Sequence, residues 1–230
     1  GCPVAWLSAV GADPVGDRIV RQLRAEGIDV EGVSVDADKP TAMMLRDRQG
    51  GTEPSVYYWR ETSAFNHATT ELVRTCNWDG TRALFLSGIT PALSERACAA
   101  TQDMVSAAQE HGVKVWFDVN HRRKLWSESE ASARLGPLLS QLDILFTSED
   151  EGRILTGHRT PEDIGRALLD KGARKVVVKL GVRGVHVFDA RGTVFCPAFT
   201  IEAEVDPIGA GDGFDAGFLS GVLAGKPVEE

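Results

Sequence analysis

The sequence predicts an α/β fold in which helices cover both faces of a doubly wound, mostly parallel β-sheet, with a small β-sheet lid attached. Short apolar runs alternate with amphipathic stretches along most of the chain, which is the pattern of repeated β-α-β units. A glycine closely follows each clear amphipathic stretch, where helices commonly stop. Residues 33–60 break the alternation, because they contain β-rich runs with no helix between them.

The apolar runs have the length and composition of buried strands. The expected strands are residues 4–10, 83–87, 113–118, 143–147 and 175–179. The stretches with helical apolar spacing are residues 15–26, 93–111 and 161–171, followed by Gly27, Gly112 and Gly172. A further β pair is predicted at residues 185–189 and 193–196, on either side of a turn-like link.

The interrupted region predicts the lid. Its β-rich runs, residues 33–35, 41–46 and 56–60, indicate a small antiparallel sheet. Such a sheet buries little core of its own, so it must lean on the main domain, on a ligand or on another subunit. We expect residues 33–60 to form the lid and residues 1–32 with 61–230 to form the α/β domain. A homodimer through the lid, or a higher homo-oligomer, is the expected assembly.

Charge and cysteine usage argue against several classes of partner. A formal net charge of −8 gives no basic footprint, which argues against nucleic acid or an anionic membrane as a partner. The longest stretch without Lys or Arg, residues 192–225, carries several acidic side chains, too many for a bilayer-spanning helix. The cysteines lie far apart without paired spacing, which argues against a zinc cluster or a disulfide framework. We expect a soluble protein of the reducing cytoplasm.

The most informative segment is residues 206–214, Asp-Pro-Ile-Gly-Ala-Gly-Asp-Gly-Phe, which passes through small residues into a helix. Small residues let backbone N–H groups approach an anion, and the positive helix terminus adds a favourable field. A carboxylate there repels phosphate unless it takes a proton from the attacking group, so Asp212 is a candidate base. The alternative is a tight turn at Gly209 and Gly211 with Asp212 as helix cap, and the spacing alone leaves both open.

The same segment, with the helix start that follows it, closely resembles the C-terminal signature of the ribokinase-type (PfkB) carbohydrate kinases. The resemblance implies a ribokinase-like fold, ATP as the phosphoryl donor and Asp212 as the catalytic base. It also implies that the amides of Gly209, Ala210 and Gly211 stabilise charge on the transferred phosphoryl group. Pro207 stands where the family usually has Thr.

Two shorter segments extend the resemblance. Residues 11–17 look like the family's early Gly-x-Asp-x-x-Gly element. Residues 148–151 look like its Asn-x-x-Glu element, with Ser148 in place of Asn. The second element implies that Glu151 organises Mg²⁺ and that Ser148 lies at the nucleotide phosphates.

Residues 179–184 are similar to the strand-turn-strand that lies along the nucleotide in the family. The resemblance makes Lys179, Gly181 and Gly184 expected nucleotide contacts. An ordinary hairpin turn is the alternative for this stretch.

Arginines near strand ends discriminate between neutral sugars and sugar acids. A substrate carboxylate benefits from a bidentate guanidinium, whereas neutral sugars are usually held by Asp and Asn. Tyr58 and Arg60 end the last lid strand, and Asp118, Asn120 and Arg122 follow a core strand, where α/β proteins bind ligands. Both stretches resemble those of 2-keto-3-deoxygluconate kinases, which implies that these residues contact the substrate.

The alternatives for the two arginines are structural. Arg60 could be a solvated cation at the lid edge, and Arg122 could pair with Asp118. Met44 stands where the resembling kinases tend to carry a lid tyrosine, and it cannot donate that hydrogen bond.

The resemblance implies transfer of the γ-phosphoryl group of MgATP to the terminal hydroxyl of 2-keto-3-deoxygluconate. Two alternatives stay open: a kinase of a neutral sugar such as fructose or ribose, and a non-catalytic sugar-acid or nucleotide sensor on the same fold. A dinucleotide-dependent dehydrogenase would need a Gly-x-Gly-x-x-Gly turn near the first strand, and the sequence has no such pairing. Against the family pattern, the chain is expected to lack the first strand and the C-terminal elements.

Overall fold

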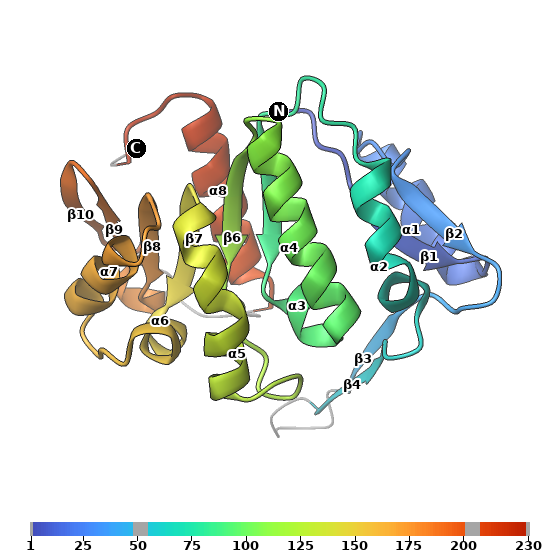
Figure 1. Ribbon diagram of the computed structural model, residues 1–230, viewed down its shortest axis with the longest axis horizontal. Helices are drawn as coiled ribbons and strands as arrows, with labels where there is room; N and C mark the ends of the chain where they lie inside the picture. Colours follow the sequence, from blue (N-terminus) through green and yellow to red (C-terminus); the bar gives the residue numbers. More distant parts are fainter. Residues whose placement is uncertain (1, 48–54, 201–207, 229–230) are drawn as a thin grey trace. The chain divides into compact units, whose positions relative to one another are not determined.

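The computed structural model describes residues 2–47, 55–200 and 208–228, and only the backbone of residues 55 and 68–71. The chain divides into two compact units (Figure 1). The first unit comprises Gly1–Cys2, Gly80–Ala92 and Val105–Glu230, and the second comprises Pro3–Asp79 and Leu93–Met104. The predicted lid boundary at residues 33–60 stays a prediction.

A six-stranded sheet with the order β10-β9-β8-β7-β6-β5 forms the centre of the first unit. Its strands are β5 (Ala83–Ser87), β6 (Lys114–Asp118), β7 (Ile144–Ser148), β8 (Lys175–Lys179), β9 (Val185–Asp189) and β10 (Gly192–Cys196). Strands β5 to β8 run parallel, and β9 and β10 add an antiparallel edge. The predicted mostly parallel α/β sheet is therefore confirmed.

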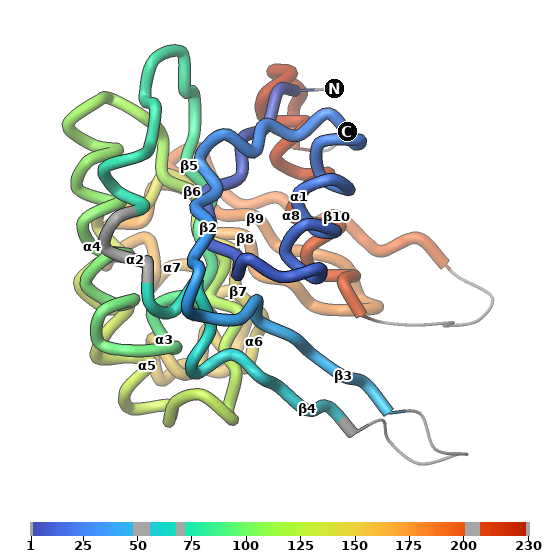
Figure 2. Tube along the Cα trace, turned by 90° about the vertical axis from the view of Figure 1, so that its right-hand side faces the viewer, coloured from blue at the N-terminus to red at the C-terminus, as the bar shows by residue number. Residues whose placement is uncertain are grey.

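Helices lie on both faces of this sheet, as Figure 2 shows for α7 and α8. The first unit contains α3 (Ile89–Leu93), α5 (Glu128–Leu135), η1 (Gly136–Gln141), α6 (Glu149–Thr156), α7 (Pro161–Asp170), η2 (Gly181–Arg183) and α8 (Ala210–Leu223), and α4 (Glu95–Glu110) ends in it. Strand residues alternate between the faces. Phe146 and Val187 pack with Leu219 of α8, whereas Phe188 lies against Gly165 of α7, where no Cβ would fit.

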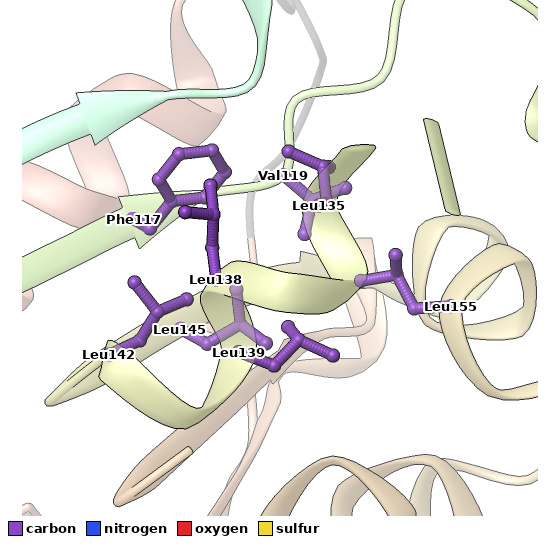
Figure 3. Close-up of a pocket in the computed structure, with 8 residues that line it drawn as sticks. All are labelled: Phe117, Val119, Leu135, Leu138, Leu139, Leu142, Leu145 and Leu155. Carbon is purple, nitrogen blue, oxygen red and sulfur yellow. The ribbon is translucent and has the colours of Figure 1, made fainter. Parts of the chain in front are cut away.

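A second apolar layer lies under the loop that follows β6. Figure 3 shows its side chains converging from β6, β7, α5, η1 and α6. They are Phe117, Val119, Leu135, Leu138, Leu139, Leu142, Leu145 and Leu155. The space between them is too narrow to admit a water molecule and has no polar lining. It is packed core that fixes the loop above it, because such interiors tolerate little displacement.

The second unit is built on a β-α-β arrangement. Strand β1 (Ser8–Gly11) pairs in parallel with β2 (Val33–Asp36), with α1 (Pro14–Ala25) between them in the sequence. Strands β3 (Met43–Asp47) and β4 (Ser55–Trp59) form a separate antiparallel pair, followed by α2 (Ala64–Thr75).

The prediction of a three-stranded antiparallel lid was wrong for its first strand. Residues 33–35 belong to β2, which is the parallel partner of β1 and does not pair with β3 or β4. The reason is connectivity: a strand that enters from a helix completes a parallel crossover, whereas antiparallel neighbours are commonly joined by a short turn.

No helix among the described parts of the chain is long and apolar enough to cross a membrane.

Candidate active site

The first turn of α8 is open to a ligand. Gly209 precedes it with a φ of 76°, a left-handed conformation that glycine adopts without strain. No side chain caps the helix at Gly209, and residues 209–212 are exposed. The first N–H groups of an α-helix have no partner within the helix, so this turn offers donors to an anion. Asp212 lies in the same first turn.

A buried ionic cluster lies beneath this turn. Lys179, the last residue of β8, places its Nζ 3.0 Å from Oδ1 of Asp118 at the end of β6. The same Nζ lies 3.3 Å from both carboxylate oxygens of Asp215 on α8. Asp118 and Asp215 are only 3% and 1% exposed. The lysine side chain reaches across β7, where its Nζ lies 5.8 Å from the centre of the Phe146 ring.

Burial and mutual repulsion set the protonation of this cluster. Burial raises the pKa of Asp215 to about 7, and the neighbouring charge of Asp118 adds to the rise. Burial also raises the pKa of Asp118, and the Lys179 ammonium offsets part of that rise. For Lys179, burial disfavours the charged form, but the two carboxylates outweigh it and raise the pKa of the ammonium group. The lysine therefore stays charged, whereas Asp215 titrates near neutral pH.

Glu151 joins two loops at the strand ends. Its Oε1 accepts a hydrogen bond from the backbone N–H of His121, and its Oε2 accepts one from Ser148, both at 2.8 Å. Ser148 is the N-cap of α6, and its hydroxyl accepts from the Glu151 N–H at 3.3 Å, which completes a capping box. Glu151 thus fixes the loop after β6 against the start of α6.

The loop after β6 contains the strained residue Asn120, whose φ of 38° is uncommon for a residue other than glycine. Left-handed backbone at such a position is often part of a binding site. Arg122, two residues further on, is exposed, and it forms no ion pair within the described part of the chain. Asp118, with which Arg122 could have formed a structural pair, is paired with Lys179 instead. The guanidinium of Arg122 is therefore open to a ligand.

The turn after β8 depends on two glycines. Gly181 has a φ of 60° and Gly184 a φ of 119°, and a Cβ at Gly184 would lie 2.1 Å from the carbonyl oxygen of Cys196. Arg183 in this turn pairs with Glu149, the first residue of α6. The turns after β7 and β8 are thus tied together.

All of residues 1–230 match the family of pfkB carbohydrate kinases. The chain belongs to this family. It is 34% identical over 227 residues to the 2-dehydro-3-deoxygluconokinase of Bacillus subtilis, covering 98% of this chain and 70% of that one. It is 33% identical to the 2-dehydro-3-deoxygalactonokinase of Haloferax volcanii, covering 100% of this chain and 72% of the relative. A solved structure of an E. coli protein described as a candidate Ribokinase II, in complex with ATP and Mg²⁺, superposes with a TM-score of 0.86 at 26% identity, covering 98% of this chain and 71% of that one.

The structure of this pfkB kinase brings several predicted site residues together within the first unit. Asp118 and Lys179 meet beneath the α8 turn of Gly209, Ala210 and Gly211, where a Cβ added to Gly211 would lie 3.7 Å from the Lys179 Nζ. Residues 206 and 207 of the signature lie outside the described residues. The predicted roles of the residues in this unit stay predictions.

The predicted lid contacts of the kinase lie in the second unit. The Arg60 guanidinium carbon lies 4.1 Å from the centre of the Tyr58 ring, a cation–π contact. Tyr58 is directly opposite Met44 in the β3–β4 pair. The carbonyl oxygen of Arg60 accepts hydrogen bonds from the N–H and hydroxyl of Ser63, which caps α2.

Asp215 is the site residue of the kinase to which the sequence assigned no role. A signal was present in the sequence, because Asp215 stands between Phe214 and Phe218 in the apolar part of the helix that follows Asp212. An ionisable group among apolar neighbours is buried only where a partner stabilises it. The partner, Lys179, comes from another element and could not be identified from spacing.

Proposed function

We propose that the protein transfers the γ-phosphoryl group of ATP to the terminal hydroxyl of 2-keto-3-deoxygluconate. The observation that carries the proposal is the uncapped first turn of α8, which offers backbone N–H donors and the exposed carboxylate of Asp212 at one place. Membership of the pfkB carbohydrate kinase family and the names of the two relatives support a sugar acid as the acceptor.

In this proposal Asp212 accepts the proton of the substrate hydroxyl as its oxygen attacks the γ-phosphorus. A new O–P bond forms, the bond from the γ-phosphorus to the bridging oxygen breaks, and ADP leaves with that electron pair. The N–H groups at Gly209, Ala210 and Gly211 donate to the phosphoryl oxygens, where charge develops in the transition state. The exposed position of Asp212 in the first turn suits a residue that must reach a bound ligand.

Mg²⁺ is the cofactor expected with ATP, and Glu151 is the residue proposed to hold it. No group of three potential metal ligands occurs among the described residues, but Mg²⁺ at kinase sites takes most of its ligands from phosphates and water. Each Glu151 oxygen already accepts one backbone N–H and retains a further lone pair. When bound, Mg²⁺ would neutralise phosphate charge. Ser148, Lys179, Gly181 and Gly184 stay proposed nucleotide contacts.

The proposed acceptor specificity depends on Arg122, whose guanidinium is exposed and free of any described ion pair. A planar guanidinium binds a carboxylate through two parallel hydrogen bonds, which a neutral sugar cannot offer. Asp118 and Asn120 are proposed to contact sugar hydroxyls. Tyr58 and Arg60 are proposed contacts on the strength of the sequence resemblance.

Coupled measurement of ADP release tests the proposal across a panel of acceptors. The panel should contain 2-keto-3-deoxygluconate, its galactonate epimer, gluconate, fructose and ribose. We expect the highest kcat/KM with a 2-keto-3-deoxy acid. A higher kcat/KM with fructose or ribose would instead support a neutral-sugar kinase, and ligand binding without any ADP release would support a sensor.

A homodimer through the lid is proposed from one face of the β3–β4 pair. Met43 is opposite Trp59 and Leu45 is opposite Tyr57, so all four side chains share a face. Each is between 48% and 56% exposed. Light scattering at micromolar concentration should give the mass of a dimer, and a monomer would contradict this assignment. The cytoplasmic location predicted from the spread cysteines also stays a prediction.

A further inference from the structure

The cluster of Asp118, Lys179 and Asp215 links three elements that are far apart in the sequence. Its members come from the ends of β6 and β8 and from the second turn of α8. The side chains of Asp118 and Asp215 are 5% and 2% exposed, and that of Lys179 is 19% exposed. Asp215 has no role in the proposed transfer chemistry, and Lys179 enters it only as a proposed nucleotide contact.

The charges of the cluster indicate its role. The positive charge of Lys179 is opposed by Asp118 and by Asp215, which is about half ionised near pH 7 because burial raises its pKa to about that value. Glu151 is a further negative group that acts on Asp118 and Lys179. The buried cluster therefore has no excess positive charge that would attract a phosphate. Its hydrogen bonds instead hold the three elements in one arrangement.

The start of α8 needs such support. No side chain caps the helix at Gly209, and a Cβ added at Gly213 or Gly217 would meet no atom within 4 Å. Within the described part of the chain, the first two turns of α8 are held by the apolar face, where Phe214 lies edge-on to Phe146, and by the Asp215 carboxyl group. A further hydrogen bond, from Arg82 to the Leu223 carbonyl oxygen, is at the other end of the helix. Asp215 follows Asp212 by less than one turn.

We propose that Lys179 and Asp215, with Asp118 as the anchor on β6, are positioning residues that fix the first turn of α8 and thereby the carboxylate of Asp212. The inference rests on the proposed function, because it assigns Asp212 the role of base. Small errors in the position of a reacting group cost large factors in rate, so a rigid support for the turn has a direct kinetic value.

Amide hydrogen exchange tests the support of the helix without any substrate. In Lys179→Met and in Asp215→Leu we expect the amides of residues 213–216, whose hydrogen bonds close the first turn of α8, to exchange about tenfold faster or more than in the wild type. Asp215→Asn keeps the hydrogen-bonding groups and should restore most of the protection. Unchanged protection of these amides in both Lys179→Met and Asp215→Leu would overturn the proposal.

Lys175 supplies a matched control on the same strand. Its Nζ lies 2.8 Å from Asp189, with both side chains 17% exposed, at the opposite end of β8. Lys175→Met should lower the melting temperature while leaving exchange of residues 213–216 unchanged. Where Lys179→Met alone does not fold, the double variant with Asp118→Asn, which removes both charges of this ion pair, takes its place.

A kinetic cycle tests the link to Asp212. Lys179→Met should lower kcat about 10- to 100-fold in the wild-type background, and less than about threefold in an Asp212→Asn background, because effects that act through one residue do not multiply. An equally large loss of kcat from Lys179→Met in both backgrounds would overturn the positioning role. If the wild type phosphorylates no acceptor, the proposed function fails, while the exchange experiment still decides whether the cluster supports the helix.

Discussion

Asp13 and Thr41 are joined by two hydrogen bonds although they lie 28 positions apart in the sequence. Oδ2 of Asp13 accepts the backbone N–H of Thr41 at 2.8 Å, and Oδ1 accepts its hydroxyl at 2.9 Å. The same carboxylate caps α1 through the N–H groups of Val15 and Gly16. The Gly-x-Asp-x-x-Gly element therefore ties the start of α1 to the residues that lead into β3.

Thr41→Val tests this connection. Thr41 is 7% exposed, and its hydroxyl accepts the N–H of Gly11 at 2.9 Å. Valine has a similar shape but leaves that buried N–H without a partner, which should lower the free energy of unfolding by about 1–3 kcal/mol. Thr41→Ser keeps the hydroxyl and should lower the free energy of unfolding by clearly less. Urea denaturation measures both, and a valine variant as stable as the wild type would contradict the assignment.

Gly16→Ala tests the close packing of the same element. In α1, alanine would ordinarily favour the helix by about 1 kcal/mol. Here its Cβ would lie 2.5 Å from the carbonyl oxygen of Gly11 and 2.8 Å from the Thr41 hydroxyl, so we expect a net loss of about 1–3 kcal/mol. Gly136→Ala is the control, because that position has a φ of −49° and open space. Equal melting temperatures for the two variants would contradict the prediction.

The pH dependence of stability should report Asp215. Its pKa is raised from the ordinary aspartate value of 3.8 to about 7 in the folded protein. Between these values the native state binds more protons than the unfolded state, so stability falls as the pH rises through this window. Asp215→Asn removes this titration. As the pH rises from 5 to 8, the free energy of unfolding of Asp215→Asn should therefore increase relative to that of the wild type. The expected change in this difference is more than about 1.4 kcal/mol, the equivalent of one pKa unit.

Urea denaturation of the wild type and Asp215→Asn at both pH values gives this difference directly. The other members of the cluster, Asp118 and Lys179, remain in both proteins. A constant difference in stability across the window would show that Asp215 does not titrate there.

Much of the fold followed from the sequence. Strands β5, β8 and β9 have the predicted bounds, because short apolar runs between helical stretches have few alternatives in an α/β protein. The pairing of β2 was missed, since the local sequence of a short strand does not specify its partner. Helix α6 was missed because its Ser148-x-x-Glu151 start was assigned to ligand binding, although the same spacing is that of a capping box.

The candidate site was less predictable. The open turn of α8 depends on local residues and could be identified from the signature that contains Gly209 and Asp212. The ionic cluster depends on where the long side chain of Lys179 ends after crossing β7, and this is a property of the folded sheet. Contacts between distant elements of this kind cannot be derived from the spacing of residues in one sequence.

Arg122→Met tests the preference for a sugar acid. Loss of a charge-assisted contact worth about 1.5–3 kcal/mol should lower kcat/KM for 2-keto-3-deoxygluconate roughly 10- to 100-fold. The value for fructose, which has no carboxylate, should change little. The exposed neighbour Arg123, replaced by Met, is the matched control. The assignment would fail if Arg122→Met and Arg123→Met had the same effect on both substrates.

The single-turnover rate of Asp212→Asn, at saturating ATP and sugar acid, tests the central claim most directly. Asparagine keeps the size of the side chain and its place in the first turn of α8 but cannot accept the proton. We expect phosphoryl transfer to fall by about 10²–10⁴-fold, with little change in nucleotide binding, sugar binding or melting temperature. Turnover near the wild-type rate in a folded Asp212→Asn protein would contradict the assignment of Asp212 as the catalytic base.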